Sequence, residues 1–208
     1  MQNVLISLYL YISKILKTIM EIVNTQLEGL LVIKPKIFAD DRGHFFESWS
    51  KAVFEKEGLD LNFAQDNQSL SAKGVLRGLH FQLAPFAQSK LVRVIEGRVL
   101  DVAVDIRVGS PNFGQHVAVE LSADNKRQLF VPRGFAHGFV VLSEAATFVY
   151  KVDNYYSPEC DRGLAFDDPE LDINWCLPKK DLILSEKDRR QPLFADLPEC
   201  FNMAKNDV

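Results

Sequence analysis

The sequence contains few of the residues that build disulfide frameworks and metal clusters. Its 208 residues include only three cysteines and four histidines. The cysteines, Cys160, Cys176 and Cys200, are odd in number and form no C-x-x-C pair. Such a set argues against a disulfide scaffold or a structural zinc site. We therefore expect free thiols and a location in the reducing cytoplasm.

A surplus of basic charge and a long apolar segment are also missing. The 24 lysines and arginines face 28 acidic residues, which gives a net charge of −4. Proteins that bind nucleic acids usually carry a strong basic excess, so no nucleic-acid partner is expected. No apolar run reaches the ~20 residues that cross a bilayer, so no membrane association is expected either.

The first nineteen residues differ from the rest of the chain. Residues 3–12 are rich in leucine, isoleucine and tyrosine, and Lys14 and Lys17 follow them. A signal peptide would place its basic residues before the apolar part and end in small residues. Two interpretations stay open, an amphipathic helix or extra sequence before a true start at Met20. We favour the second, with an extension over residues 1–19 and a single domain over residues 20–208.

Most of the remaining chain shows the pattern of short strands separated by turns, which is typical of a β-sandwich or small barrel. Residues 99–106 alternate apolar residues with Asp101, Ala103 and Asp105, as a half-buried strand does. Residues 51–58 form the one convincing short helix, which Gly58 should end. The other predicted strands are residues 26–36, 45–49, 91–95, 116–121, 128–131, 135–142 and 147–152.

The stretch of residues 73–82 (KGVLRGLHFQ) combines a permanent cation with a group that titrates near neutral pH. Arg77 and His80 are three positions apart, so in a regular strand they would point to opposite faces. A bulge at Gly78 would turn both side chains toward one cavity, where they would suit an anionic substrate that exchanges a proton. The alternative is an edge strand with a solvated arginine and a hydrogen-bonded core histidine.

Several further motifs follow in a fixed order: QSKLV at 88–92, GRV at 97–99, DIR at 105–107, GSP at 109–111, PRGFAHGF at 132–139, YK at 150–151, YYSP at 155–158 and LSEKD at 184–188. Together with RGLHFQ at 77–82, they make the chain resemble the dTDP-4-dehydrorhamnose 3,5-epimerase family from Met20 to about Leu197. The resemblance implies an all-β, cupin-type jelly roll that works without metal or other cofactor. It also implies a homodimer whose N-terminal strands exchange between subunits.

The resemblance further implies a substrate, a dTDP-linked 4-keto-6-deoxy sugar, and four catalytic residues. His80 matches the base, Asp188 the acid that orients it, Lys90 the cation near the C4 oxygen, and Tyr150 the proton donor on the opposite face of the sugar. Without the resemblance, Asp188 reads as a helix cap and Lys90 as a solvated edge charge.

Substrate binding is assigned by the same resemblance. Arg42 and Arg77 match residues that grip the diphosphate, where the guanidinium geometry suits phosphate oxygens. The pocket positions, some of them supplied by the partner subunit, are Phe45, Glu47, Gln65, Asn67, His137 and Tyr156. Phe45 could equally be core and Glu47 a solvated charge.

Three other functions were weighed against a double epimerase. A metal-dependent cupin would carry a His-x-His pair, but Phe81 and Gln82 follow His80, and the four histidines are scattered. An epimerase that acts at C3 or C5 alone would use much the same residues. A non-catalytic sugar-nucleotide binding module would be expected to have lost His80 or Asp188, and both are present.

Overall fold

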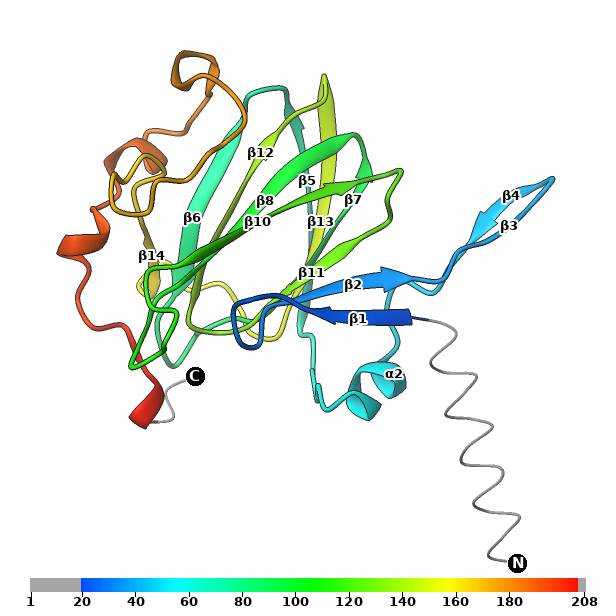
Figure 1. Cartoon of the computed structure of the whole chain (residues 1–208), viewed down its shortest axis with the longest axis horizontal. Helices are drawn as coiled ribbons and strands as arrows, with labels where there is room; N and C mark the ends of the chain where they lie inside the picture. The colour runs from blue at the N-terminus through cyan, green and yellow to red at the C-terminus, as the bar shows by residue number, and fades with distance from the viewer. Residues whose placement is uncertain (1–19, 206–208) are drawn as a thin grey trace, which may run out of the picture.

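The computed structural model describes residues 20–205, and the expected extension over residues 1–19 lies outside this part of the chain. Two antiparallel sheets stack face to face, as Figure 1 shows. The six-stranded sheet has the order β1-β2-β11-β7-β13-β5, and the five-stranded sheet has the order β10-β8-β12-β6-β14. This confirms the predicted all-β jelly-roll fold. The single domain over residues 20–208 stays a prediction.

The strands of the six-stranded sheet are β1 (Met20–Asn24), β2 (Leu31–Pro35), β11 (Gln128–Val131), β7 (Lys90–Glu96), β13 (Ala145–Val152) and β5 (Gln65–Ala72). Those of the five-stranded sheet are β10 (His116–Ser122), β8 (Arg98–Asp105), β12 (Phe135–Val141), β6 (Leu76–Gln82) and β14 (Asp161–Gly163). Two small sheets pair β3 (Phe38–Asp40) with β4 (Gly43–Phe45), and β9 (Arg107–Val108) with β15 (Phe201–Asn202).

Helical structure is sparse. The predicted helix is confirmed as α2 (Lys51–Lys56), after which Gly58 takes a positive φ of 84°. Four 3-10 turns follow later: η1 (Lys179–Asp181), η2 (Asp188–Arg190), η3 (Phe194–Asp196) and η4 (Met203–Lys205). Within residues 20–205, no helix is long and apolar enough to cross a membrane.

Three apolar layers hold the sandwich together. The middle layer lies between the sheets and includes Val92 and Phe148 from one sheet with Ala103 and Phe139 from the other. A second layer covers the outer face of the five-stranded sheet with the C-terminal segment, including Trp175. The third places α2 over the outer face of β2, β7 and β11. Burial of these apolar faces is the main stabilising term.

Three strand predictions need correction, and two of them concern the sandwich. Residues 26–36 are not one strand, because Thr25 accepts the backbone N–H of Leu27 and donates to the carbonyl of Leu30, closing a turn before β2. The strand predicted at residues 99–106 is present as β8, but it is not half-buried as expected. β8 is buried at every position after Arg98, since the C-terminal segment covers its outer face and the six-stranded sheet covers its inner face. Asp101 and Asp105 share the inner face with Val99 and Ala103, and both are buried carboxylates.

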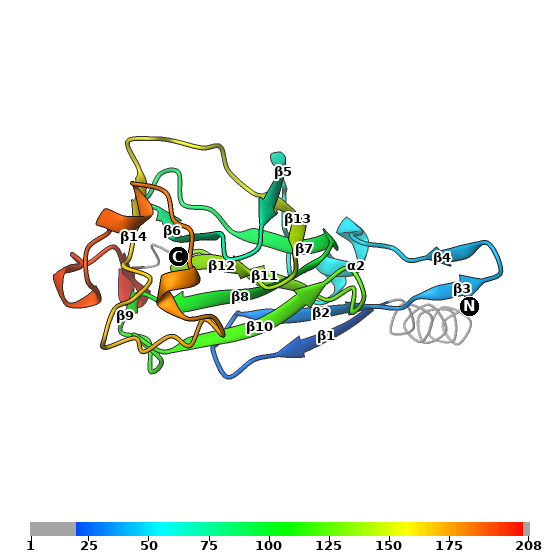
Figure 2. The ribbon, with the colours of Figure 1, turned by 90° about the horizontal axis from the view of Figure 1, so that it is seen from above.

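The β3–β4 hairpin extends away from the sandwich in both views (Figures 1 and 2). All residues of its two strands are exposed, and Phe45 keeps 70% of its surface accessible. A turn at residues 40–43 (DDRG) joins the two strands. The predicted strand at residues 45–49 is wrong, because β4 ends at Phe45 and residues 46–50 are irregular.

Candidate active site

A bulge in β6 brings Arg77 and His80 to one cavity, as predicted. His80 lies opposite His137 of β12 and Arg77 lies opposite Phe139, so three steps along β6 match two along β12. Gly78 makes this shift with a φ of 126°, and a Cβ there would lie 2.5 Å from the Cα of Gly138. Only glycine fits so close an approach of two backbones at this φ.

His80 forms a hydrogen-bonded chain with Asp188 and Ser185. His80 Nε2 lies 2.5 Å from Asp188 Oδ1, and the Ser185 hydroxyl donates to Asp188 Oδ2 at 2.8 Å. Burial of Asp188 favours its neutral form, but the hydrogen bonds from His80 and Ser185 outweigh burial and lower its pKa. An ionised carboxylate only accepts hydrogen bonds, so Nε2 carries a proton and the lone pair of the neutral ring lies on Nδ1.

Lys90 and Tyr150 line the same cavity from the six-stranded sheet. Lys90 starts β7, and its Nζ donates to the backbone oxygen of His80 at 3.4 Å. Burial lowers the pKa of Lys90 to about 8, against the opposing effect of Asp101 and Asp161. Burial raises the pKa of Tyr150, which keeps the phenol protonated at neutral pH.

The imidazole of His137 stacks near Phe148 and contacts a buried carboxylate that sequence reasoning missed. His137 Nε2 lies 2.8 Å from Oδ1 of Asp101, which is fully buried in β8. Burial is the largest effect and raises the pKa of Asp101 overall, while the charge and hydrogen bond of His137 and the charge of Lys90 favour the ionised carboxylate against it. The period-two pattern around Asp101 gave no sign that this position faces the site, since such an aspartate is usually solvated.

The cavity has a volume of about 410 Å³. Two hydrogen bonds hold lining residues in place: Arg77 donates to Ser71 Oγ at 3.1 Å, and Asn67 accepts a hydrogen bond from Gln65 at 2.7 Å. At least eight of the twelve predicted site residues border this space: Asn67, Arg77, His80, Lys90, His137, Tyr150, Tyr156 and Asp188. Gln65 reaches it through its bond to Asn67.

Sequence reasoning also missed a polar group beside Tyr156. The Tyr156 hydroxyl donates to Asp161 Oδ2 at 3.0 Å, and Lys187 forms an ion pair with the same carboxylate. All three side chains line the cavity. The two missed residues are Asp161, in β14, and Lys187, just before η2. They lie far apart in sequence, so no local motif links them.

Besides Gln65, three predicted residues do not line the cavity. Arg42 and Phe45 lie on the β3–β4 hairpin, where Arg42 pairs with Asp40 at 2.6 Å. That contact lowers the pKa of Asp40. Glu47 lies in the irregular segment that returns from the hairpin to α2. Within this chain the three are separate from His80.

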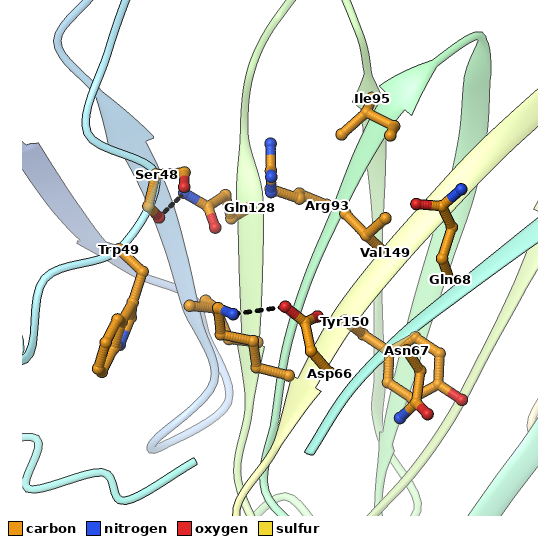
Figure 3. Close-up of a pocket in the computed structure, with 12 residues that line it drawn as sticks. Ser48, Trp49, Asp66, Asn67, Gln68, Arg93, Ile95, Gln128, Val149 and Tyr150 are labelled. Carbon is orange, nitrogen blue, oxygen red and sulfur yellow. Dashed lines mark hydrogen bonds and ion pairs between the residues drawn. The ribbon is translucent and has the colours of Figure 1, made fainter. Parts of the chain in front are cut away.

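A second cavity, of about 370 Å³, lies on the other side of β13 and β5. Figure 3 shows its lining, with Ser48 accepting a hydrogen bond from Gln128 Nε2 and Asp66 paired with a lysine of β13. Asn67 and Tyr150 border both cavities. No imidazole of residues 20–205 lines this second space, whereas His80 and His137 both line the first.

The arrangement around the first cavity suits proton transfer next to a carbonyl. It combines an imidazole with a free ring nitrogen, a buried ammonium and a protonated phenol. Among residues 20–205, no three His, Cys, Asp or Glu side chains gather in a way that could hold a metal ion.

Comparison with known proteins gives a consistent result. The sequence profile of the family described as dTDP-4-dehydrorhamnose 3,5-epimerase matches residues 24–196. The Shigella flexneri protein of that name is 52% identical over 178 residues, which cover 85% of this chain and 97% of the relative.

Two solved structures share the fold. That of dTDP-4-dehydrorhamnose 3,5-epimerase from Elizabethkingia anophelis has a TM-score of 0.81 and 52% identity, and the match covers 85% of this chain and 97% of that one. A Legionella pneumophila dTDP-6-deoxy-D-glucose-3,5-epimerase, solved with dTDP-4-keto-L-rhamnose, has a TM-score of 0.82 and 50% identity, with 86% and 95% covered.

Proposed function

Because the chain belongs to the dTDP-4-dehydrorhamnose 3,5-epimerase family, we propose that it epimerises C3 and C5 of dTDP-4-dehydro-6-deoxy-D-glucose. The product would be dTDP-4-dehydro-L-rhamnose, a precursor in dTDP-L-rhamnose biosynthesis. The observation that carries this proposal is the convergence of His80, paired with Asp188, with Lys90 and Tyr150 on one cavity.

The chemistry follows from the C4 ketone of the substrate. The carbonyl makes the hydrogens at C3 and C5 acidic, because loss of either leaves an enolate. His80 Nδ1 removes the proton, while Asp188 stabilises the imidazolium that forms. The Lys90 ammonium stabilises the negative charge that develops on the C4 oxygen. Tyr150 then protonates the carbon from the opposite face, which inverts its configuration.

Groups around this centre would hold the rest of the substrate. The Arg77 guanidinium suits the oxygens of the diphosphate. Asn67, oriented by Gln65, and His137 would bind the sugar, and Tyr156 offers an aromatic face to the nucleotide. No step in this scheme needs a metal or an organic cofactor.

Product configuration tests the proposal. Proton NMR of the keto sugar after incubation with the enzyme should show inversion at both C3 and C5, with no product from His80→Ala. His116→Ala, which changes a histidine of β10 outside the cavity, is the matched control and should retain activity. Inversion at one carbon would assign a single-position epimerase. Binding without inversion would assign a sugar-nucleotide binding module.

We also propose a homodimer in which the β3–β4 hairpin crosses to the partner subunit. The hairpin is fully exposed, and β5 is an edge strand that presents Leu70 with 67% of its surface accessible. An exposed edge is a ready site for pairing with another strand. The exchange would bring Arg42 and Phe45 of one copy, and Glu47 behind them, to the cavity of the other.

Complementation between inactive variants tests this exchange. Arg42→Ala and His80→Ala each inactivate a homodimer, but a mixed dimer would pair an intact His80 with an intact Arg42 at one of its two sites. Unfolding and refolding an equal mixture should restore activity at about a quarter of the wild-type sites, since half of the dimers are mixed. If the hairpin serves its own subunit, the mixture will stay inactive.

A cytoplasmic location is part of the same proposal. Cys160, Cys176 and Cys200 are all free thiols, as a reducing compartment favours.

A further inference from the structure

We propose that Asp101 is a positioning residue of the active site, whose carboxylate both orients His137 and provides the counter-charge for the Lys90 ammonium. This inference rests on the proposed function, because it gives the charge on Lys90 a catalytic purpose. Asp101 does not line the cavity, so it would act through its neighbours.

The position of Asp101 in the core is the first reason. Its side chain points inward between the sheets, on the same face of β8 as Val99 and Ala103, and no part of it reaches solvent. Moving a carboxylate into such surroundings costs several kcal/mol unless nearby groups compensate its charge. A carboxylate there therefore requires partners.

One of the two carboxylate oxygens of Asp101 has a hydrogen-bond partner among the described residues, and the other has none. Oδ1 contacts His137 Nε2 at 2.8 Å. Oδ2 is buried and has no hydrogen-bond partner among the described residues. Lys90 has donors to spare, since its one hydrogen bond to residues 20–205 is the 3.4 Å contact with the His80 backbone. The acceptor without a partner is Oδ2 of Asp101, and the available donors are those of Lys90. The charges of these two side chains attract each other.

Among the charged groups around Lys90, Asp101 contributes most to stabilising its ammonium form. Asp101 from β8 and Asp161 from β14 favour the ammonium, and Asp101 contributes more. Lys187, before η2, opposes it. The side chains of His80, His137 and Tyr150 border the same cavity from β6, β12 and β13.

The consequence concerns activity near neutral pH. Burial leaves Lys90 with a pKa of about 8, so the ammonium outnumbers the neutral amine only about tenfold at pH 7. Without the charge of Asp101, the pKa would fall further and a neutral amine would face the C4 oxygen. A neutral amine stabilises an enolate poorly. In this way a residue outside the cavity sets the upper pH limit of catalysis.

The test is Asp101→Asn, which removes the charge but keeps an oxygen that can accept a hydrogen bond from His137. The wild-type kcat/KM should decline as pH rises through about 8. In Asp101→Asn the midpoint of this decline should move to a pH lower by about one unit or more. A shift of one unit corresponds to a tenfold change in the protonation equilibrium of Lys90. In a Lys90→Arg background, whose guanidinium does not titrate, the same substitution should cause no shift. An unchanged midpoint in Asp101→Asn would overturn the proposal.

A readout independent of epimerase activity separates this inference from the proposed function. The rate of Lys90 acetylation by acetic anhydride, followed by peptide mass spectrometry, reports the fraction of neutral amine at each pH. Its midpoint should fall in Asp101→Asn even if the chain proves to act on no keto sugar. An unaltered midpoint would overturn the role of Asp101 and leave the epimerase proposal intact.

If the Asp101→Asn variant does not fold, the pairing can be tested with a double variant in which neither Lys90 nor Asp101 carries a charge. Lys90→Met alone leaves the carboxylate of Asp101 without its cation, and should lower the melting temperature. Adding Asp101→Asn should recover part of the loss, because neither charge then remains. Strictly additive losses would contradict the pairing.

Discussion

The substitution Asp188→Asn addresses the base most directly. It keeps the size of the side chain and one oxygen, but removes the charge that holds the proton on His80 Nε2. An amide in this place can turn its NH₂ group toward the ring. The imidazole would then carry its proton on Nδ1, the atom that should remove the substrate proton.

The size of the effect follows from the contact that is lost. A hydrogen bond to a charged group contributes about 1.5–3 kcal/mol. If it is fully expressed in the transition state, its loss lowers the rate about tenfold to 150-fold. The wrong tautomer adds to this loss, so we expect kcat to fall at least about 100-fold. KM should change less than about threefold, because Asp188 acts through His80.

The assay is the initial rate of epimerisation over a range of substrate concentrations at pH 7. Glu186→Gln is the matched control, because it makes the same chemical change two residues away. That side chain is 78% exposed and pairs with Arg190. The control should keep kcat within about twofold, as surface substitutions usually do. A fall in kcat of less than threefold in Asp188→Asn, or an equal fall in both variants, would refute the role of the pair.

Three further substitutions test the surroundings of the site. Ser185→Ala removes the donor to Asp188 Oδ2 and should lower kcat about tenfold with little change in KM. Ser185→Thr keeps a hydroxyl and should restore most of kcat. Equal rates in the alanine and threonine variants would contradict this role of the hydroxyl. Gly78→Ala brings a Cβ to 2.8 Å from the His137 oxygen, and chemical denaturation should show a loss of about 2–3 kcal/mol along with the activity. Gly58→Ala, with no atom within 4 Å, should cost only about 1 kcal/mol, so equal losses at both glycines would argue against the close approach. Phe54→Ala empties a buried position in α2 and should cost about 3–5 kcal/mol, while the folded fraction retains its pH profile; an altered profile would tie α2 to the site.

The bulge at Gly78 shows how far local sequence can lead. Two functional side chains three positions apart, with a glycine between them, left two interpretations open, and the structure shows the one in which a bulge turns both toward one cavity. The prediction of the α2 helix was equally local in origin. Each depends on a few neighbouring residues, whose backbone preferences the sequence displays directly.

The errors arose where distant segments decide the outcome. β8 was expected to be half-buried because nothing near it indicated that the C-terminal segment would cover its outer face. Asp101 was missed because its own face of β8, shared with Val99 and Ala103, packs toward the six-stranded sheet, which no local pattern indicated. Asp188 lies 108 residues from His80, so its role came from the resemblance and not from a local pattern. The positions of Arg42 and Phe45 depend on a second copy of the chain, in our proposal, and no single-chain pattern can reveal that.

Deuterium exchange tests the proposed mechanism most directly. The keto sugar is incubated with enzyme in deuterated water, and NMR follows the label at each carbon. We predict deuterium at both C3 and C5 with the wild type, and at neither carbon with His80→Ala. Exchange at both carbons that persists in His80→Ala would contradict the assignment of His80 as the base.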